Sequence, residues 1–128
     1  MSFTLHLDGP VWRQHTAEVR DALRTAIRGG EQPARLGDLV AKGNGYGLGL
    51  SRLAAEATRL GVDRVAVGSV FEVPEVAQHY AGEILVLTPW DPRDVVAAQH
   101  WEQLDPSHRD RVIRTVSDVH SAKELPMG

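Results

Sequence analysis

The chain has 128 residues, 42% of them hydrophobic, so it is long enough for one ordinary core but too short for two full domains. Its formal net charge of −3 gives no basic field, which argues against nucleic acid and anionic membranes as partners. The absence of cysteine excludes disulfides, thiolate metal ligands and a cysteine nucleophile. Because no signal peptide or membrane-spanning stretch is recognisable, a cytoplasmic protein is expected.

Residue periodicity predicts strands that alternate with helices. The first helix is expected over residues 10–28, starting after Asp8 and ending at Gly29 and Gly30. The elements predicted after it are a strand at 36–41, a glycine-rich turn at 43–49, a helix at 50–60 closed by Gly61, a strand at 65–67, a helix at 71–80, a strand at 84–87, a helix at 95–101, a strand at 112–116 and a helix at 118–125.

This alternation predicts an α/β fold with a parallel sheet, because parallel strands need long crossovers and bury both faces. A (β/α) barrel and an open doubly wound sheet both fit the pattern. Between Pro89 and Arg111 the periodicity is weak, and Pro92 and Pro106 interrupt it.

Lys42 stands at the end of a predicted strand, in a chain with only two lysines and twelve arginines. The ordinary explanation is a surface cation that closes the strand. The functional interpretation is a Schiff-base lysine, because a lysine amine can lose its proton and attack an aldehyde, whereas arginine stays protonated. The position favours the functional interpretation, since active sites of barrels lie where strands end.

The glycines after Lys42 would let a backbone approach a phosphate ahead of the next helix. Dinucleotide binding is the competing hypothesis. However, Leu48 or Leu50 stands where the last glycine of G-x-G-x-x-G is required, and no acidic residue ends the following strand.

The stretch from Val40 to Gly49, VAKGNGYGLG, resembles the cofactor-attachment signature of the alanine racemase family, V-K-A-N-A-Y-G-H-G. The lysine, asparagine, tyrosine and two glycines are in register. Glycines replace the two alanines of the signature, at Gly43 and Gly45, and Leu48 replaces its histidine. Segments around Leu5–Asp8, Ala66–Val73, Ile84–Thr88 and Thr115–Leu125 resemble other parts of the family's N-terminal barrel domain, in order.

The resemblance implies a PLP (pyridoxal 5'-phosphate) enzyme in which Lys42 forms the Schiff base and then serves as one proton-transfer base. Tyr46 matches the family tyrosine near the cofactor phosphate. The intact protein would interconvert L- and D-alanine or a related small amino acid. The replacement at Leu48 removes a polar group from the cofactor region and leaves substrate preference open.

About four strands are expected in residues 1–128, which corresponds to a truncated first half of a (β/α)8 TIM-type barrel. Unclosed strands leave apolar edges, so self-association as a homo-oligomer is expected, and the chain alone is expected to be inactive as a racemase. An alternative function is that of a PLP-binding carrier without racemase activity, as in related single-barrel proteins.

Other conspicuous residues give weaker signals. The six histidines show no metal-ligand spacing, so no metal site is expected. Trp12 and Trp101 are predicted to pack on helices, while Trp90 is predicted either to pack at the sheet rim or to face the site. Ser51 is interpreted as a helix N-cap.

Overall fold

The structure, a computed structural model, describes residues 4–27 and 38–125. The chain divides into two compact units, residues 1–36 and 37–128, which are described separately. In the first unit, helix α1 runs over Gly9–Ile27. The Asp8 side chain accepts a hydrogen bond from the Val11 amide at 3.1 Å, which confirms the predicted start of this helix. The predicted end at Gly29 and Gly30 lies outside the described residues.

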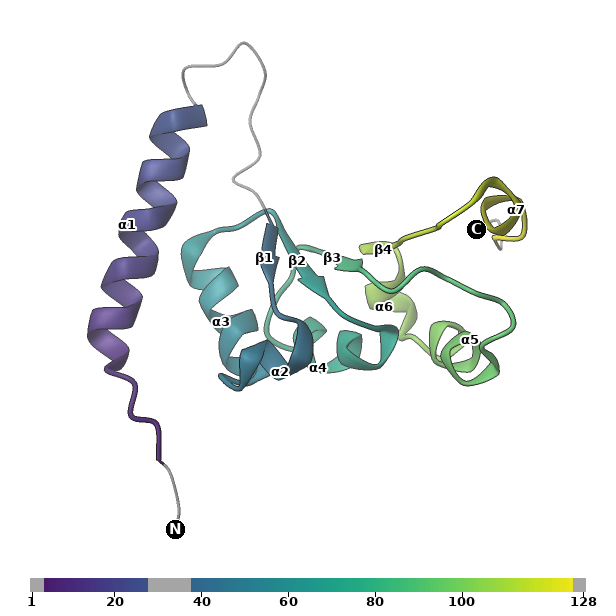
Figure 1. Cartoon of the computed structure of the whole chain (residues 1–128), viewed down its shortest axis with the longest axis horizontal. Helices are drawn as coiled ribbons and strands as arrows, with labels where there is room; N and C mark the ends of the chain where they lie inside the picture. The colour runs from purple at the N-terminus through teal and green to yellow at the C-terminus, as the bar shows by residue number, and fades with distance from the viewer. Residues whose placement is uncertain (1–3, 28–37, 126–128) are drawn as a thin grey trace. The chain divides into compact units, whose positions relative to one another are not determined.

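The second unit is built on a four-stranded parallel sheet whose strands lie side by side in chain order (Figure 1). The strands are β1 (Asp38–Val40), β2 (Arg64–Val67), β3 (Glu83–Val86) and β4 (Val112–Arg114). Val40 pairs with Ala66, Ala66 with Leu85, and Leu85 with Ile113. The parallel sheet is therefore confirmed, and its sequential order is that of a barrel, since a doubly wound sheet reverses direction between its halves.

Helical segments connect the strands at the predicted places, except over Lys42–Tyr46, where a glycine-rich turn was predicted, and over Pro106–Arg109, where no element was predicted. They are α2 (Lys42–Tyr46), α3 (Leu50–Leu60), the 3₁₀ turn η1 (Val70–Glu72), α4 (Val73–Ala77), α5 (Val95–Glu102), α6 (Pro106–Arg109) and α7 (Val119–Lys123). The helix over 50–60 has the predicted bounds, and Gly61 ends it with a left-handed φ of 66°. The single helix expected over 71–80 is instead η1 followed by the short α4.

Two local features explain where the prediction failed. The helical segment ends before Tyr80 because that side chain turns inward and donates a hydrogen bond to the Val62 carbonyl at 2.8 Å. The unpredicted α6 begins at Pro106, after Asp105 accepts the Ser107 amide at 2.8 Å. Proline is favoured in a first helical turn, so the residue interpreted as an interruption starts a helix.

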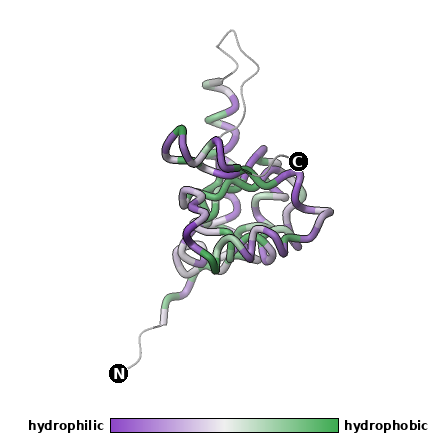
Figure 2. Tube along the Cα trace, turned by 90° about the vertical axis from the view of Figure 1, so that its right-hand side faces the viewer, coloured by the Kyte–Doolittle hydropathy of each residue, from purple (hydrophilic) through white to green (hydrophobic). Residues whose placement is uncertain are grey.

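The core lies between the sheet and its helices. Val65, Val67, Ile84 and Val86 are almost fully buried, and the helices contribute Leu53, Ala54, Ala57, Val73 and Val76. Figure 2 shows these hydrophobic stretches gathered inside the larger unit. Because side chains alternate along a strand, the strand residues of this buried set share one face of the sheet.

The other face of the sheet is more accessible, and we call its row of Val40, Ala66, Leu85 and Ile113 the open face. Val40 is 40% exposed, Leu85 and Ile113 are half-buried, and the small Ala66 between Val40 and Leu85 is buried. At the amino end of the same face, Arg64 binds Glu83 at 2.9 Å and Asp38 at 3.7 Å. No helix among the described residues is both long enough and apolar enough to cross a membrane.

Candidate functional site

The segment after β1, labelled α2, is a single left-handed turn and not a regular α-helix. Gly43, Asn44 and Gly45 have φ values of 63°, 54° and 65°, and Tyr46 follows at 55°. Side chains with a Cβ are strained in this region, whereas glycine is not and asparagine is tolerated. The two glycines that replace the alanines of the signature therefore suit the backbone geometry of the predicted turn.

Hydrogen bonds hold this turn against β1 and α3. The Gly45 amide donates to the Ala41 carbonyl at 2.9 Å, and the Gly49 amide donates to the Asn44 carbonyl at 2.9 Å. The Asn44 side chain accepts from the Leu50 amide at 3.1 Å, so Asn44 satisfies the first amide of α3. The predicted cap role of Ser51 is wrong, because the Ser51 hydroxyl donates to Glu75 at 2.8 Å.

Lys42 lies at the carboxyl edge of the sheet, with an exposed side chain. Its neighbour on the next strand is Gly68, which follows β2. An ideal Cβ at Gly68 would stand 3.4 Å from the Lys42 Cβ. Because Gly68 has no side chain, the space beside the stem of Lys42 is bordered by the Glu72 carboxylate, whose oxygens lie 3.5 and 3.6 Å from the same point.

Tyr46 belongs to the same turn as Lys42, and 69% of its surface is exposed. A bulky residue with positive φ stores backbone strain, and such strain clusters at ligand-binding and catalytic sites. The structure thus brings the two residues singled out in the sequence into one strained turn. Leu48 is half-buried between this turn and α3.

Sequence reasoning missed two residues of this edge, Glu72 and Thr88. The Gly68 amide donates to Glu72 Oε2 at 2.8 Å. The Gly68 carbonyl accepts from the Thr88 hydroxyl at 2.5 Å and from the Thr88 amide at 2.9 Å. A signal for Glu72 was present, because Ser69-Val70-Phe71-Glu72 has the spacing of a capping box.

Tyr80 lies at the opposite, amino end of the strands. Burial raises the pKa of its hydroxyl, with smaller contributions from the nearby Asp63 and Glu83. Its hydrogen bond to the Val62 carbonyl occupies the hydroxyl proton. Tyr80 is therefore a packing residue rather than a partner of Lys42.

Trp90 packs at the rim of the sheet, which is one of the two positions predicted for it. Trp90 is 8% exposed. The Arg114 guanidinium lies 5.7 Å from the centroid of the Trp90 ring and 4.5 Å from the centroid of the Trp101 ring. Burial lowers the pKa of Arg114, and the nearby Arg109 adds to the effect. The pair of cation–π contacts ties the ends of β3 and β4 to α5.

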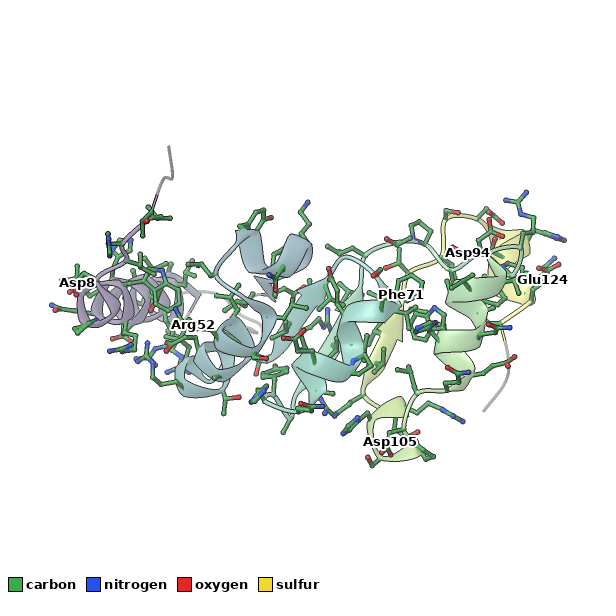
Figure 3. All side chains as sticks on the ribbon, turned by 90° about the horizontal axis from the view of Figure 1, so that it is seen from below. Asp8, Arg52, Phe71, Asp94, Asp105 and Glu124 are labelled. Carbon is green, nitrogen blue, oxygen red and sulfur yellow. The ribbon has the colours of Figure 1, made fainter. Side chains whose placement is uncertain are left out.

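The outer helices carry further polar and aromatic contacts. The rings of Phe71 and His100 pack edge to face, with their centroids 4.4 Å apart. Asp94 and Asp105 are the N-cap residues of α5 and α6 (Figure 3). Within residues 4–27 and 38–125, no group of three or more histidines and carboxylates is arranged to hold a metal ion.

Comparisons with known proteins agree with this fold. The family described as alanine racemase, N-terminal domain, matches residues 19–124. Alanine racemase from Oenococcus oeni has a similar structure, with a TM-score of 0.54 and 24% sequence identity over 84% of this chain and 28% of that chain. The likeness shows the fold, which is the first half of a barrel of parallel strands and helices. No curated protein matches the chain. Since the family match covers most of its length, the chain belongs to the alanine racemase N-terminal domain family.

Proposed function

We propose that this chain supplies the lysine-bearing part of a PLP-dependent amino-acid racemase. Lys42 is the residue that binds the cofactor, and alanine or a related small amino acid is the substrate of the whole protein. The observation that supports this most directly is the exposed Lys42 amine, carried on a strained left-handed turn at the carboxyl edge of a parallel sheet.

The residues present fit the chemical groups of PLP. An aldehyde needs an accessible primary amine, which Lys42 offers beside the bare backbone of Gly68. A phosphate needs hydrogen-bond donors, and the exposed Tyr46 hydroxyl is one such donor on the same turn. When bound, the cofactor supplies an electron sink for the substrate's α-carbon.

The chain's own residues have distinct tasks in this proposal. Lys42 holds the cofactor through Nζ and, when its amine is free, accepts or returns a proton on one side of the substrate. Tyr46 orients the phosphate. Racemisation also needs a proton donor on the opposite side, and Tyr80 is unsuitable because its hydroxyl is buried at the other end of the strands.

The position of Tyr80 also favours a second candidate function for residues 1–128 alone, which is to hold PLP without racemising amino acids. With Tyr80 buried and Tyr46 assigned to the phosphate, we propose that the proton donor opposite Lys42 comes from another segment or subunit. We therefore expect residues 1–128 to capture the cofactor but not to turn over alanine at an enzymatic rate.

The test is to incubate the chain with PLP, trap the adduct with borohydride and map the labelled peptide. We expect the label on Lys42 and only background labelling on Lys123. The variant Lys42→Ala should lose the label, while Lys123→Ala keeps it. Equal labelling of the two lysines would contradict the assignment.

Alanine racemisation, followed by chiral chromatography, separates the two candidates. Wild type, Lys42→Ala and free PLP with a simple amine should exchange alanine at similarly low rates. A rate for wild type far above both comparisons would mean that this chain itself supplies the second proton donor, and the carrier interpretation would then be wrong.

A further inference from the structure

The left-handed turn interrupts the hydrogen-bond ladder between β1 and β2. In that ladder the Ala41 amide donates to the Ala66 carbonyl at 2.8 Å. The regular parallel pattern would continue with the Gly68 amide donating to the Ala41 carbonyl. Here the Ala41 carbonyl instead accepts from Gly45, at 2.9 Å, because the chain reverses its handedness after Lys42.

The Gly68 amide therefore does not donate to the Ala41 carbonyl, and the Glu72 side chain serves as its acceptor instead. The Glu72 carboxylate, which projects back from the end of η1, accepts that amide at 2.8 Å. The Gly68 carbonyl on the other side is fixed by two hydrogen bonds from Thr88. Both polar groups of Gly68 are therefore held by side chains or backbone from later in the chain.

The hydrogen bond from Gly68 to Glu72 also brings the Glu72 carboxylate beside Lys42. Both Glu72 oxygens lie within 3.6 Å of the point where a Cβ of Gly68 would stand, and the Lys42 Cβ lies 3.4 Å from the same point. The stem of Lys42 and the Glu72 carboxylate thus border one small space above Gly68.

We propose that Glu72 is a positioning residue for Lys42. Its hydrogen bond to Gly68 fixes the end of β2, and the fixed Gly68 backbone sets where the stem of Lys42 lies at the sheet edge. The inference rests on the proposed function in one respect, which is that Lys42 is the residue to be positioned for capture of an aldehyde.

The experiment compares Glu72→Ala with Glu72→Gln, whose amide oxygen still accepts a hydrogen bond, and with the control Glu75→Ala on α4. Amide hydrogen exchange of Gly68 should accelerate about tenfold in Glu72→Ala, as expected for loss of a hydrogen bond to a charged group. The nuclear Overhauser contact between Lys42 Hβ and Gly68 Hα should weaken in the same variant. Both should stay near wild type in Glu72→Gln and Glu75→Ala.

The functional readout is the rate at which PLP is trapped on Lys42 relative to Lys123 in the same sample. We expect this ratio to fall about three- to tenfold in Glu72→Ala, which is a misalignment cost of roughly 1 kcal/mol, and to be restored in Glu72→Gln. If Glu72→Ala does not fold, Glu72→Asp, whose shorter side chain retracts the carboxylate, takes its place.

Two results would overturn the inference. The first is an unchanged rate of Gly68 amide exchange in Glu72→Ala, which would show that the hydrogen bond does not protect Gly68. The second is faster Gly68 exchange with an unchanged ratio of PLP trapping on Lys42 and Lys123, which would show that the hydrogen bond has only a structural role. If wild type traps PLP equally on both lysines, the proposed function has failed instead. In that case the Overhauser contact still decides whether Glu72 fixes Lys42.

Discussion

Gly45 is the residue at which this chain depends most clearly on the absence of a side chain. An ideal Cβ there would stand 2.5 Å from Leu53 Cδ1, and Leu53 is buried in α3. The φ of 65° adds backbone strain. We expect Gly45→Ala to lower the free energy of unfolding by about 2–4 kcal/mol, the sum of left-handed strain and local overpacking. Urea denaturation measures this change.

Gly43 provides the matched control, because it has nearly the same φ but nothing within 4 Å of an added Cβ. Gly43→Ala should therefore cost only the strain, about 1–2 kcal/mol. In the double variant Gly45→Ala with Leu53→Ala, the two costs should be less than additive, since the smaller side chain makes room. Equal costs at Gly43 and Gly45 would show that the contact with Leu53 is unimportant.

The residues of the site were only partly predictable. Lys42 and Tyr46 were singled out because the signature has a fixed spacing. The handedness of their turn was not predicted, since glycine and asparagine permit a positive φ without requiring it. Glu72 was missed for a related reason. The capping-box spacing from Ser69 marks Glu72 as a residue of a helix start, but not as the acceptor of the Gly68 amide. That role arises only because the turn removes the Ala41 carbonyl from the ladder, which follows from geometry.

The short helices α6 and α7 depend on aspartate caps. Asp105 accepts the Ser107 amide at 2.8 Å, and Asp118 accepts the Ser121 amide at 2.7 Å. Hydrogen bonds from these serines lower the pKa of both carboxyl groups below the usual 3.8. A lowered pKa in the folded state means that the stabilisation is complete about one pH unit above 3.8 and is lost progressively as the pH falls through 3.8 toward the lower pKa of the folded state. The urea midpoint should therefore decline between pH 5 and pH 3.

Replacing both aspartates with asparagine isolates this contribution, because asparagine caps a helix without titrating in this range. We expect the double variant to show a shallower decline of the midpoint between pH 5 and pH 3 than wild type. If the two proteins decline in parallel, other carboxyl groups account for the acid sensitivity.

Among the elements, long periodic segments were predicted well and short ones poorly. The helix over Leu50–Leu60 has three turns and an apolar stripe, so its pattern is distinctive. The four residues of α6 are too few to show a period, and only the pair Asp105-Pro106 marked it. The end of this helical segment before Tyr80 goes with a hydrogen bond from Tyr80 to a residue 18 positions away, which local periodicity does not encode.

At the scale of the whole molecule, the open face leads us to propose self-association with a second copy. Its charged groups at the amino end, Asp38, Arg64 and Glu83, are already paired with one another, so the apolar row is what a second copy would cover. A copy related by a two-fold axis would pack the same row of side chains against itself. Light scattering on residues 1–128 should therefore give a mass above that of the monomer, which is 14.0 kDa.

The variant Leu85→Asp, which places a charge in the middle of the open face, should shift the mass toward that of the monomer. Val96→Asp is the control, because Val96 is 57% exposed on α5 rather than on the sheet. Wild type that stays monomeric over a broad concentration range would contradict the proposal. Equal effects of the two substitutions would point to a different contact surface.

The parallel sheet and its alternation with helices were predictable because each strand and helix has its own hydrophobic pattern. Periodicity alone did not predict the strand order, since a barrel and a doubly wound sheet share that pattern. The resemblance to the alanine racemase family implied the barrel, and the strand pairing confirms it. The likeness to the O. oeni racemase extends the barrel interpretation to 84% of the chain.

The chain order of the strands has a consequence for synthesis on the ribosome. Each of β2, β3 and β4 pairs with the strand made immediately before it, so these three pairings do not wait for a distant segment. Lys42 is nevertheless translated well before its neighbours, because Gly68, Glu72 and Thr88 emerge 26, 30 and 46 residues later. The lysine therefore leaves the ribosome on an unsupported segment. Its surroundings are complete only when β3 has been added and Thr88 has closed over the end of β2.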